Sequence, residues 1–381
     1  MKRLWTLLLI LLVLLTNCKS KPESHDGPFQ DIQEIKTAAP FKIVKEKEIN
    51  LKNQTGVDPV PKLLALPDKL LVFHFQAPGA QKKKVFCDAY SHQLEWLWRK
   101  EFYAGQGPGD IVPACRVFFI NNLIYCLEYR YKRISIFDTE MNLQRITKAL
   151  STNTDSSISA EGDYYIGTSS APGNKDLTIW KTRIGGNEKE KLAYFGPFSG
   201  SRYDNGNQKR LLKSLPDIII FSRENHVFFL NCKTYTINRV NITGTLDKAV
   251  HYIVPEITLS EEEKERDLAA LLKSYNIPSH RQSRFALASF VQPASGVAYL
   301  TNGFVVLRQE NYNPVYPKTI EGDYFTYDLV PKGKLQFPSF IDCGNKYGIN
   351  TQQPYKNGIY LVQQAPEDQE SDTLTYYKIV E

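Results

Sequence analysis

Short apolar runs separated by turn residues recur along most of this chain. Within residues 117–146 there are four such runs, at 117–120, 123–127, 133–137 and 143–146. Asn121 and Asn122 separate the first two runs, and asparagine tolerates the positive φ angles of a two-residue hairpin turn. Four short strands in about 40 residues, each antiparallel to the next, are typical of one β-propeller blade.

The same pattern predicts five more blades. They begin near residues 62, 157, 218, 284 and 339, with residues 324–329 in the outer part of the fifth and residues 339–343, 358–363 and 373–380 in the last. Residues 41–51 alternate apolar and charged positions, as a half-solvated strand does. A lone strand before the first blade can complete the last one and close the ring. We therefore predict an all-β, six-bladed β-propeller over residues 41–381, with seven blades as an alternative.

One insertion has a helical pattern. Ser260 and Glu263 have the spacing of a capping box. One apolar stripe at helical spacing follows, formed by Leu268, Leu271, Leu272 and Tyr275. This predicts a helix near residues 260–276, ended by Pro278. We expect it to pack on the flank of the propeller; a lid over one face, or a partner-docking element, is the alternative.

The amino terminus is typical of a targeting signal. Lys2 and Arg3 precede an apolar stretch at residues 4–16, which is shorter than the roughly 20 residues of a membrane-spanning helix. Residues 15–18, Leu-Thr-Asn-Cys, resemble a bacterial lipobox, although Asn17 departs from the usual small residue. The resemblance implies a signal peptide at 1–17, lipidation of Cys18, a flexible tether at 18–40 and an outer-membrane address. An ordinary secretory signal is the alternative.

A glycine-rich segment follows the first predicted blade. Residues 105–110 read Gly-Gln-Gly-Pro-Gly-Asp and, with the strands at 124–127 and 134–138, resemble the six-bladed, NHL-like β-propeller lipoproteins. The resemblance covers residues 41–381 and implies the fold rather than a function, because propellers include binding modules and enzymes. The segment is not a phosphate-binding loop, because the Lys-Ser/Thr ending is absent. Its turn-forming, structural residues are Gly105, Gly107, Pro108, Gly109 and Asp110.

Composition and charge exclude some classes of function. The chain is 42% hydrophobic and 12% aromatic, and its formal net charge is +6. The charges are interspersed, and no basic face with interleaved aromatic residues indicates nucleic-acid binding. The six cysteines have no metal-binding spacing. Cys115 and Cys126 are expected to be diagonal neighbours about 7–8 Å apart, too far for a disulfide, so buried free thiols are predicted.

Two sets of side chains are candidates for a site. Six residues on or near predicted strands could surround calcium in the central tunnel, as in propeller hydrolases: Asp88, Glu128, Asp163, Asn231, Asn302 and Asp342. The sequence does not determine which of these side chains face the tunnel, because a one-residue shift in register turns every side chain of a strand to the other face. Trp96 and Trp98 are predicted to share one strand face, and Trp180 lies in another strand. We expect these tryptophans to pack between blades, with a sugar- or peptide-binding platform as the alternative.

The sequence therefore predicts a binding protein rather than a particular reaction. We expect a lipid-anchored envelope propeller that binds a protein, peptide or carbohydrate, contacts the membrane through its lipid and uses no cofactor. No catalytic residues are recognised. The alternatives are a calcium-dependent hydrolase or lyase with an acidic tunnel site, and a structural envelope protein.

Overall fold

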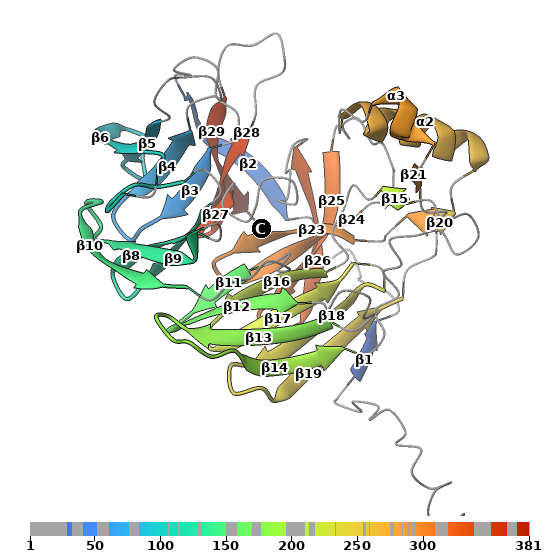
Figure 1. Cartoon of the computed structure of the whole chain (residues 1–381). Helices are drawn as coiled ribbons and strands as arrows, with labels where there is room; N and C mark the ends of the chain where they lie inside the picture. Colours follow the sequence, from blue (N-terminus) through green and yellow to red (C-terminus); the bar gives the residue numbers. More distant parts are fainter. Residues whose placement is uncertain are drawn as a thin grey trace, which may run out of the picture.

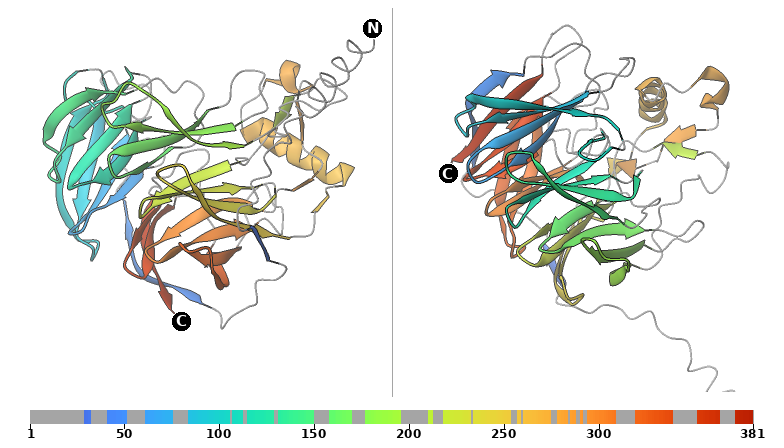
Figure 2. Two further views of the ribbon diagram at one scale, coloured as in Figure 1. Left: turned by 90° about the horizontal axis from the view of Figure 1, so that it is seen from below. Right: turned by 60° about the vertical axis from the view of Figure 1, so that its left-hand side comes forward.

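Six antiparallel sheets form a ring around a common axis, which is a six-bladed β-propeller (Figures 1 and 2). The predicted fold class is confirmed. The computed structural model describes residues 29–32, 41–51, 61–75, 84–105, 107–112, 115–128, 131–149, 158–169, 177–195, 210–212, 218–232, 234–253, 257–258, 260–274, 278–283, 285–287, 290–291, 294–308, 319–338, 352–363 and 372–380.

The first three blades each take four strands in chain order from the axis outward. Blade 1 consists of β3 (Lys62–Ala65), β4 (Leu70–Phe75), β5 (Lys84–Tyr90) and β6 (Trp96–Tyr103). Blade 2 consists of β7 (Arg116–Ile120), β8 (Leu123–Glu128), β9 (Arg133–Phe137) and β10 (Leu143–Lys148). Blade 3 consists of β11 (Ile158–Glu161), β12 (Tyr164–Ser169), β13 (Leu177–Arg183) and β14 (Glu190–Phe195).

The other three blades include two strands from the N-terminal part of the chain. Blade 4 consists of β16 (Ile218–Arg223), β17 (His226–Asn231), β18 (Thr236–Asn241), β19 (Leu246–Tyr252) and β1 (Phe29–Ile32). Blade 5 consists of β23 (Ala294–Leu300), β24 (Gly303–Arg308), β25 (Thr319–Thr326) and β26 (Pro331–Pro338). Blade 6 consists of β27 (Gln352–Tyr355), β28 (Gly358–Gln363), β29 (Thr373–Val380) and β2 (Lys42–Asn50).

The ring is closed by the predicted pairing of its two chain ends. β2 is antiparallel to β29, with Lys42 opposite Val380 and Asn50 opposite Thr373. The innermost strands also contact one another around the axis, β27 with β3 and β3 with β7 among them. Blade 6 is therefore built from both ends of the propeller domain.

Both faces of each blade are buried between its neighbours. Among the residues that the structure describes, six hydrophobic clusters occur, one at each interface between adjacent blades. In β17, Val227 and Phe229 face blade 3, whereas Phe228 and Leu230 face blade 5. An uninterrupted apolar run is therefore compatible with a strand in this fold, because successive side chains point to opposite faces and both faces are buried.

The short hairpins follow from residues that accept left-handed backbone. Asn121 and Asn122, between β7 and β8, have φ of 50° and 61°. Glu224 and Asn225, between β16 and β17, have φ of 54° and 64°. Two consecutive positive φ angles match the right-handed twist of the flanking strands.

The predicted helix is confirmed as α2 (Glu261–Ser274). The Ser260 hydroxyl accepts the Glu263 backbone N–H at 3.2 Å, and the Glu263 carboxylate accepts the Ser260 backbone N–H at 2.9 Å. Together with α3 (Ser279–Gln282) it lies outside the ring (Figures 1 and 2). Four short strands lie in the same region, β15 (Arg210–Leu212), β20 (Ile257–Thr258), β21 (Phe285–Leu287) and β22 (Phe290–Val291).

Some predicted boundaries are wrong. The fifth blade begins at Ala294, not near residue 284, because β21 pairs in parallel with β15 instead of joining a blade. The strand expected at residues 324–329 ends earlier, because β25 runs from Thr319 to Thr326 and a turn follows. The inner strand of blade 6 is β27, and residues 339–343 lie outside the described residues.

The segment expected to be a tether contains a strand. β1 pairs in parallel with β19, with Phe29 opposite Ala249 and Ile32 opposite Tyr252 (Figure 1). It therefore covers the outer edge of blade 4, so residues 29–32 belong to the sheet structure. The predicted signal peptide and Cys18 lie outside the described residues.

Candidate ligand-binding site

A cavity of about 370 Å³ lies where blades 5 and 6 meet. Its described lining comes from four separate places: the β23–β24 turn, β25, the β27–β28 turn, and one end of the closing β2–β29 strand pair. The lining residues are Phe41, Leu300, Thr301, Asn302, Tyr324, Lys356, Asn357, Ile379 and Val380. The volume is at the low end of the roughly 300–1,000 Å³ of small-molecule sites.

Two hairpin turns of the same sequence type line this cavity. Both read x-Asn-Gly, with Gly303 and Gly358 as the first residues of β24 and β28. A Cβ on Gly303 would be 2.1 Å from the Phe325 carbonyl oxygen, and one on Gly358 would be 2.3 Å from that of Tyr377. Glycine at these two positions lets each turn lie directly against the neighbouring strand.

The cavity combines apolar walls with a few polar groups. Phe41 and Tyr324 are in edge-to-face contact, with ring centroids 5.4 Å apart. The Asn357 side-chain amide donates to the Ile379 carbonyl at 3.3 Å, and the Ile379 N–H donates to the Asn357 carbonyl at 2.8 Å. This pair fixes the β27–β28 turn to the end of β29.

Lys356 contributes the charge of the cavity. It is the one charged residue among the described lining residues, and its Nζ lies 5.3 Å from the centroid of the Tyr355 ring. Tyr355 is in turn stacked on His92 at 3.7 Å. Burial lowers the pKa of His92, and the nearby Lys356 charge lowers it further.

The acidic residues proposed for a tunnel site are not brought together. Asp88 is buried in β5, where Arg99 binds both its carboxylate oxygens at 2.6 and 2.7 Å. His74 lies 3.1 Å from the same carboxylate. Glu128, fully buried at the end of β8, is paired with Arg133. Each of these carboxylates already has a cationic partner within its own blade.

The other described candidates come from three other blades. Asp163 and Asn302 are in the first hairpin turns of blades 3 and 5, and Asn231 ends β17. Asp342 lies outside the described residues. Among the residues described, no three His, Cys, Asp or Glu side chains are close enough to hold a metal ion. Among the described members of the predicted set, only Asn302 lines the cavity.

The glycine-rich segment is a turn that joins β6 to β7 and is held by Arg133. The Arg133 guanidinium donates to the carbonyls of Gly105, Gly107 and Asp110 at 3.1–3.2 Å. The Asp110 carboxylate accepts the Gly107 N–H at 2.7 Å. A Cβ on Gly105 or Gly107 would be 2.4 or 2.8 Å from that carboxylate, and Gly109 has φ of +84°. The contacts place this turn between blades 1 and 2.

The tryptophans do not form one platform. Trp180 is buried and edge-to-face with Tyr165 at 5.7 Å, and Trp98 packs against the blade 1–blade 2 cluster. Trp96, in contrast, is 60% exposed. The prediction that Trp96 and Trp98 share a face is wrong. Trp96 is opposite Tyr90 and Trp98 is opposite the adjacent Ala89, so Leu97 is the extra residue of a bulge and the two tryptophans face opposite sides of the strand.

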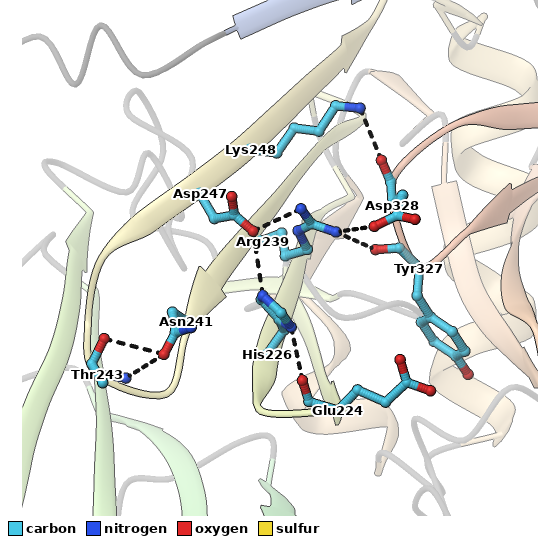
Figure 3. A network of polar contacts seen from close by, with 9 residues as sticks. All are labelled: Glu224, His226, Arg239, Asn241, Thr243, Asp247, Lys248, Tyr327 and Asp328. Carbon is cyan, nitrogen blue, oxygen red and sulfur yellow. Dashed lines mark hydrogen bonds and ion pairs between the residues drawn. The ribbon is translucent and has the colours of Figure 1, made fainter.

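Blades 4 and 5 are joined by two polar networks outside the cavity. In the buried one, Tyr235 donates to Asp323 at 2.5 Å and Arg308 binds the same carboxylate oxygen at 2.6 Å. In the exposed one, Arg239 binds Asp247 of its own blade and Asp328 of blade 5, both at 2.7 Å (Figure 3). These contacts position the blades, and none of the six residues lines the cavity.

The four described cysteines, Cys87, Cys115, Cys126 and Cys232, are buried free thiols. Cys115 lies in a turn before β7 rather than in the ladder, since its N–H donates to the Val112 carbonyl at 3.0 Å. Cys343 is outside the described residues.

Comparisons with known proteins support the fold. A Bacteroides vulgatus structure, a member of the DUF4221 family, is 11% identical with a TM-score of 0.54, over 90% of this chain and 99% of that one. A putative exported protein from Bacteroides fragilis is 12% identical with a TM-score of 0.46, over 93% and 99%. At such identities the first similarity shows a shared fold and no function. No family model and no curated protein matches the sequence.

No helix among the described residues is long and apolar enough to cross a membrane.

The Asp88 ion pair should make stability depend on pH in the acid range. Burial raises the pKa of Asp88, but the hydrogen bonds from Arg99 and His74 outweigh it and lower the pKa from 3.8 to about 2. Between pH 4 and pH 2 the Asp88 carboxylate is protonated more in the unfolded chain than in the folded one, so lowering the pH favours unfolding. The pair's contribution of about 2 kcal/mol is present above pH 4 and is lost as the pH falls through 2.

Urea unfolding from pH 6 to pH 2, followed by tryptophan fluorescence, measures this effect. We expect Asp88→Asn to be less stable than wild type at pH 6 and to lose about 2 kcal/mol less on acidification. Asp68→Asn, which changes an exposed carboxylate of the same blade, is the control and should keep the wild-type slope. An Asp88→Asn curve parallel to wild type would contradict the assignment.

Proposed function

We propose that this protein is a ligand-binding β-propeller of the cell envelope and that the cavity between blades 5 and 6 receives the ligand. The observation that carries the proposal is the composition of the cavity. It has aromatic and aliphatic walls, two asparagine side chains and one lysine, which is the mixture of apolar surface and few polar groups found in small-molecule sites.

The position of the cavity supports this function. Its polar residues Thr301, Asn302, Lys356 and Asn357 all belong to hairpin turns, and turns on a rigid scaffold can vary without loss of the fold. The sheets beneath them are tied on both sides by the blade 4–blade 5 and blade 6–blade 1 clusters. The site is therefore preorganised, which lowers the entropic cost of binding.

The hydrolase or lyase alternative receives no specific support from the described residues. Asp88 and Glu128 are neutralised by arginines, and the cavity lining contains no carboxylate, histidine or cysteine among those residues. Binding is therefore the function that the geometry favours, with a carbohydrate or a peptide as the ligand.

A blocking substitution tests the cavity. We expect Asn302→Trp to fill the cavity mouth and to weaken binding at least tenfold for any ligand found in a panel of neutral and acidic oligosaccharides and short peptides. Saturation-transfer NMR provides the measurement. Asp163→Trp, at the second position of the corresponding blade 3 turn, should bind like wild type. Equal binding by Asn302→Trp, or no binding of any panel member by wild type, would refute the proposal.

We also propose that the protein is an outer-membrane lipoprotein similar to the NHL-like propellers, anchored through Cys18. The support is the lipobox-like segment before Cys18 and the lysine after it. Since β1 starts at Phe29, ten residues separate Cys18 from the propeller. Fully extended, this linker spans at most about 36 Å, at 3.3–3.6 Å per residue, so blade 4 would be held close to the membrane.

Metabolic labelling with a radioactive fatty acid tests the anchor. Wild type should incorporate label and pellet with membranes, whereas Cys18→Ser should lose nearly all label. Cys343→Ser serves as the cysteine control and should be labelled fully. Undiminished label in Cys18→Ser would disprove lipidation at this residue, without affecting the proposal for the cavity.

A further inference from the structure

We infer that the cavity between blades 5 and 6 selects a saccharide that carries a carboxylate, with Lys356 as the residue that recognises the acid. This inference rests on the proposed function and names the ligand class of the same site. The nearest alternative ligand is a peptide that binds by adding a strand.

The backbone of the cavity argues against strand addition. A peptide of that kind needs an unpaired strand edge, but the backbone of two strand residues that line the cavity is paired on both sides. Tyr324 lies between Val305 and Gly333, and Ile379 is opposite Ile43 and donates its N–H to the Asn357 carbonyl. The cavity therefore offers side chains rather than a free row of N–H and C=O groups.

The side chains of the cavity match a hydroxylated ring. Thr301, Asn302 and Tyr324 provide a hydroxyl, an amide and a phenol, each of which can donate and accept hydrogen bonds as sugar hydroxyls require. Leu300, Ile379 and Val380 provide apolar surface for the C–H faces of such a ring. A cavity of about 370 Å³ limits the ligand to a small one.

The charge of Lys356 decides between neutral and acidic saccharides. Its side chain makes no ion pair with any described residue, and its Nζ lies 5.3 Å from the centroid of the Tyr355 ring. Tyr355 is in turn stacked on His92. An ammonium group beside an aromatic ring, and without a carboxylate partner among the described residues, is available for a charge-assisted hydrogen bond to an acidic ligand.

Calorimetry with two matched probes tests the inference. The probes are a glucuronic-acid-terminated oligosaccharide and the same oligosaccharide ended in glucose. Wild type should bind the acidic probe at least tenfold more tightly at low ionic strength, and the preference should shrink as salt is added. Lys356→Met should reduce the preference below threefold, by weakening the acidic probe more than the neutral one. Lys356→Arg should keep the preference.

Control and contrary outcomes separate this inference from the proposed function. Lys332→Met, an exposed lysine of β26 outside the cavity, should bind both probes like wild type, and all variants should share one unfolding temperature. Equal affinity of wild type for both probes, or equal weakening of both by Lys356→Met, overturns the inference. Failure of wild type to bind either probe also overturns it, and the ligand panel then decides separately whether the cavity binds anything.

Discussion

The pairing of β2 with β29 is the constraint on which the rest of the structure depends. Each blade is apolar on both faces, as the alternating contacts of β17 show. An open row of six such sheets would leave one face of the first blade and one of the last exposed to water. Closure brings blade 6 against blade 1, where Leu63 and Val72 pack on Tyr360 and Leu374. The hydrophobic gain at this interface, at roughly 25 cal/mol per Å² of apolar surface, is available only to a closed ring.

The same closure builds the candidate site. Phe41 immediately precedes β2, and Ile379 and Val380 end β29, so one wall of the cavity is the end of the closing strand pair. The x-Asn-Gly turns of blades 5 and 6 also line the cavity. Ring closure and the candidate site are therefore linked: a ring that failed to close would lose both the blade 6–blade 1 interface and one wall of the cavity.

The N-terminal segment extends this linkage along the outside of the molecule. β1 adds to the outer edge of blade 4 in parallel with β19, and β2 adds to blade 6. A long uncovered edge strand is a template for unwanted pairing; β1 covers Ala249–Tyr252 of β19, so the outermost strand of blade 4 is only four residues long. Residues 29–32 therefore belong to the sheet structure of the propeller.

The sequence predicts the elements well and their orientation poorly. Runs such as residues 227–230 identify strands because both faces of a blade are buried, and Asn121 and Asn122 identify a turn because they tolerate positive φ. The face of β5 on which Asp88 lies depends on the strand register. The placement of Trp96 and Trp98 on opposite faces of β6 depends on a bulge. Local sequence encodes neither. The cavity could not be predicted because its residues come from segments up to 339 positions apart, from Phe41 to Val380; only the repeated x-Asn-Gly turns were a usable signal.

An engineered disulfide across the closing strands tests ring closure most directly. Val44 is opposite Lys378, and opposite residues of an antiparallel pair are within the roughly 4.4–6.8 Å Cα separation of a disulfide. In a background with Cys18 and Cys343 changed to serine, Val44→Cys with Lys378→Cys should form an intramolecular bridge that links the two terminal peptides after proteolysis. Val44→Cys with Glu95→Cys, an exposed residue of blade 1, should not. No bridge in the first pair, or equal bridging in both, would contradict closure by β2 and β29.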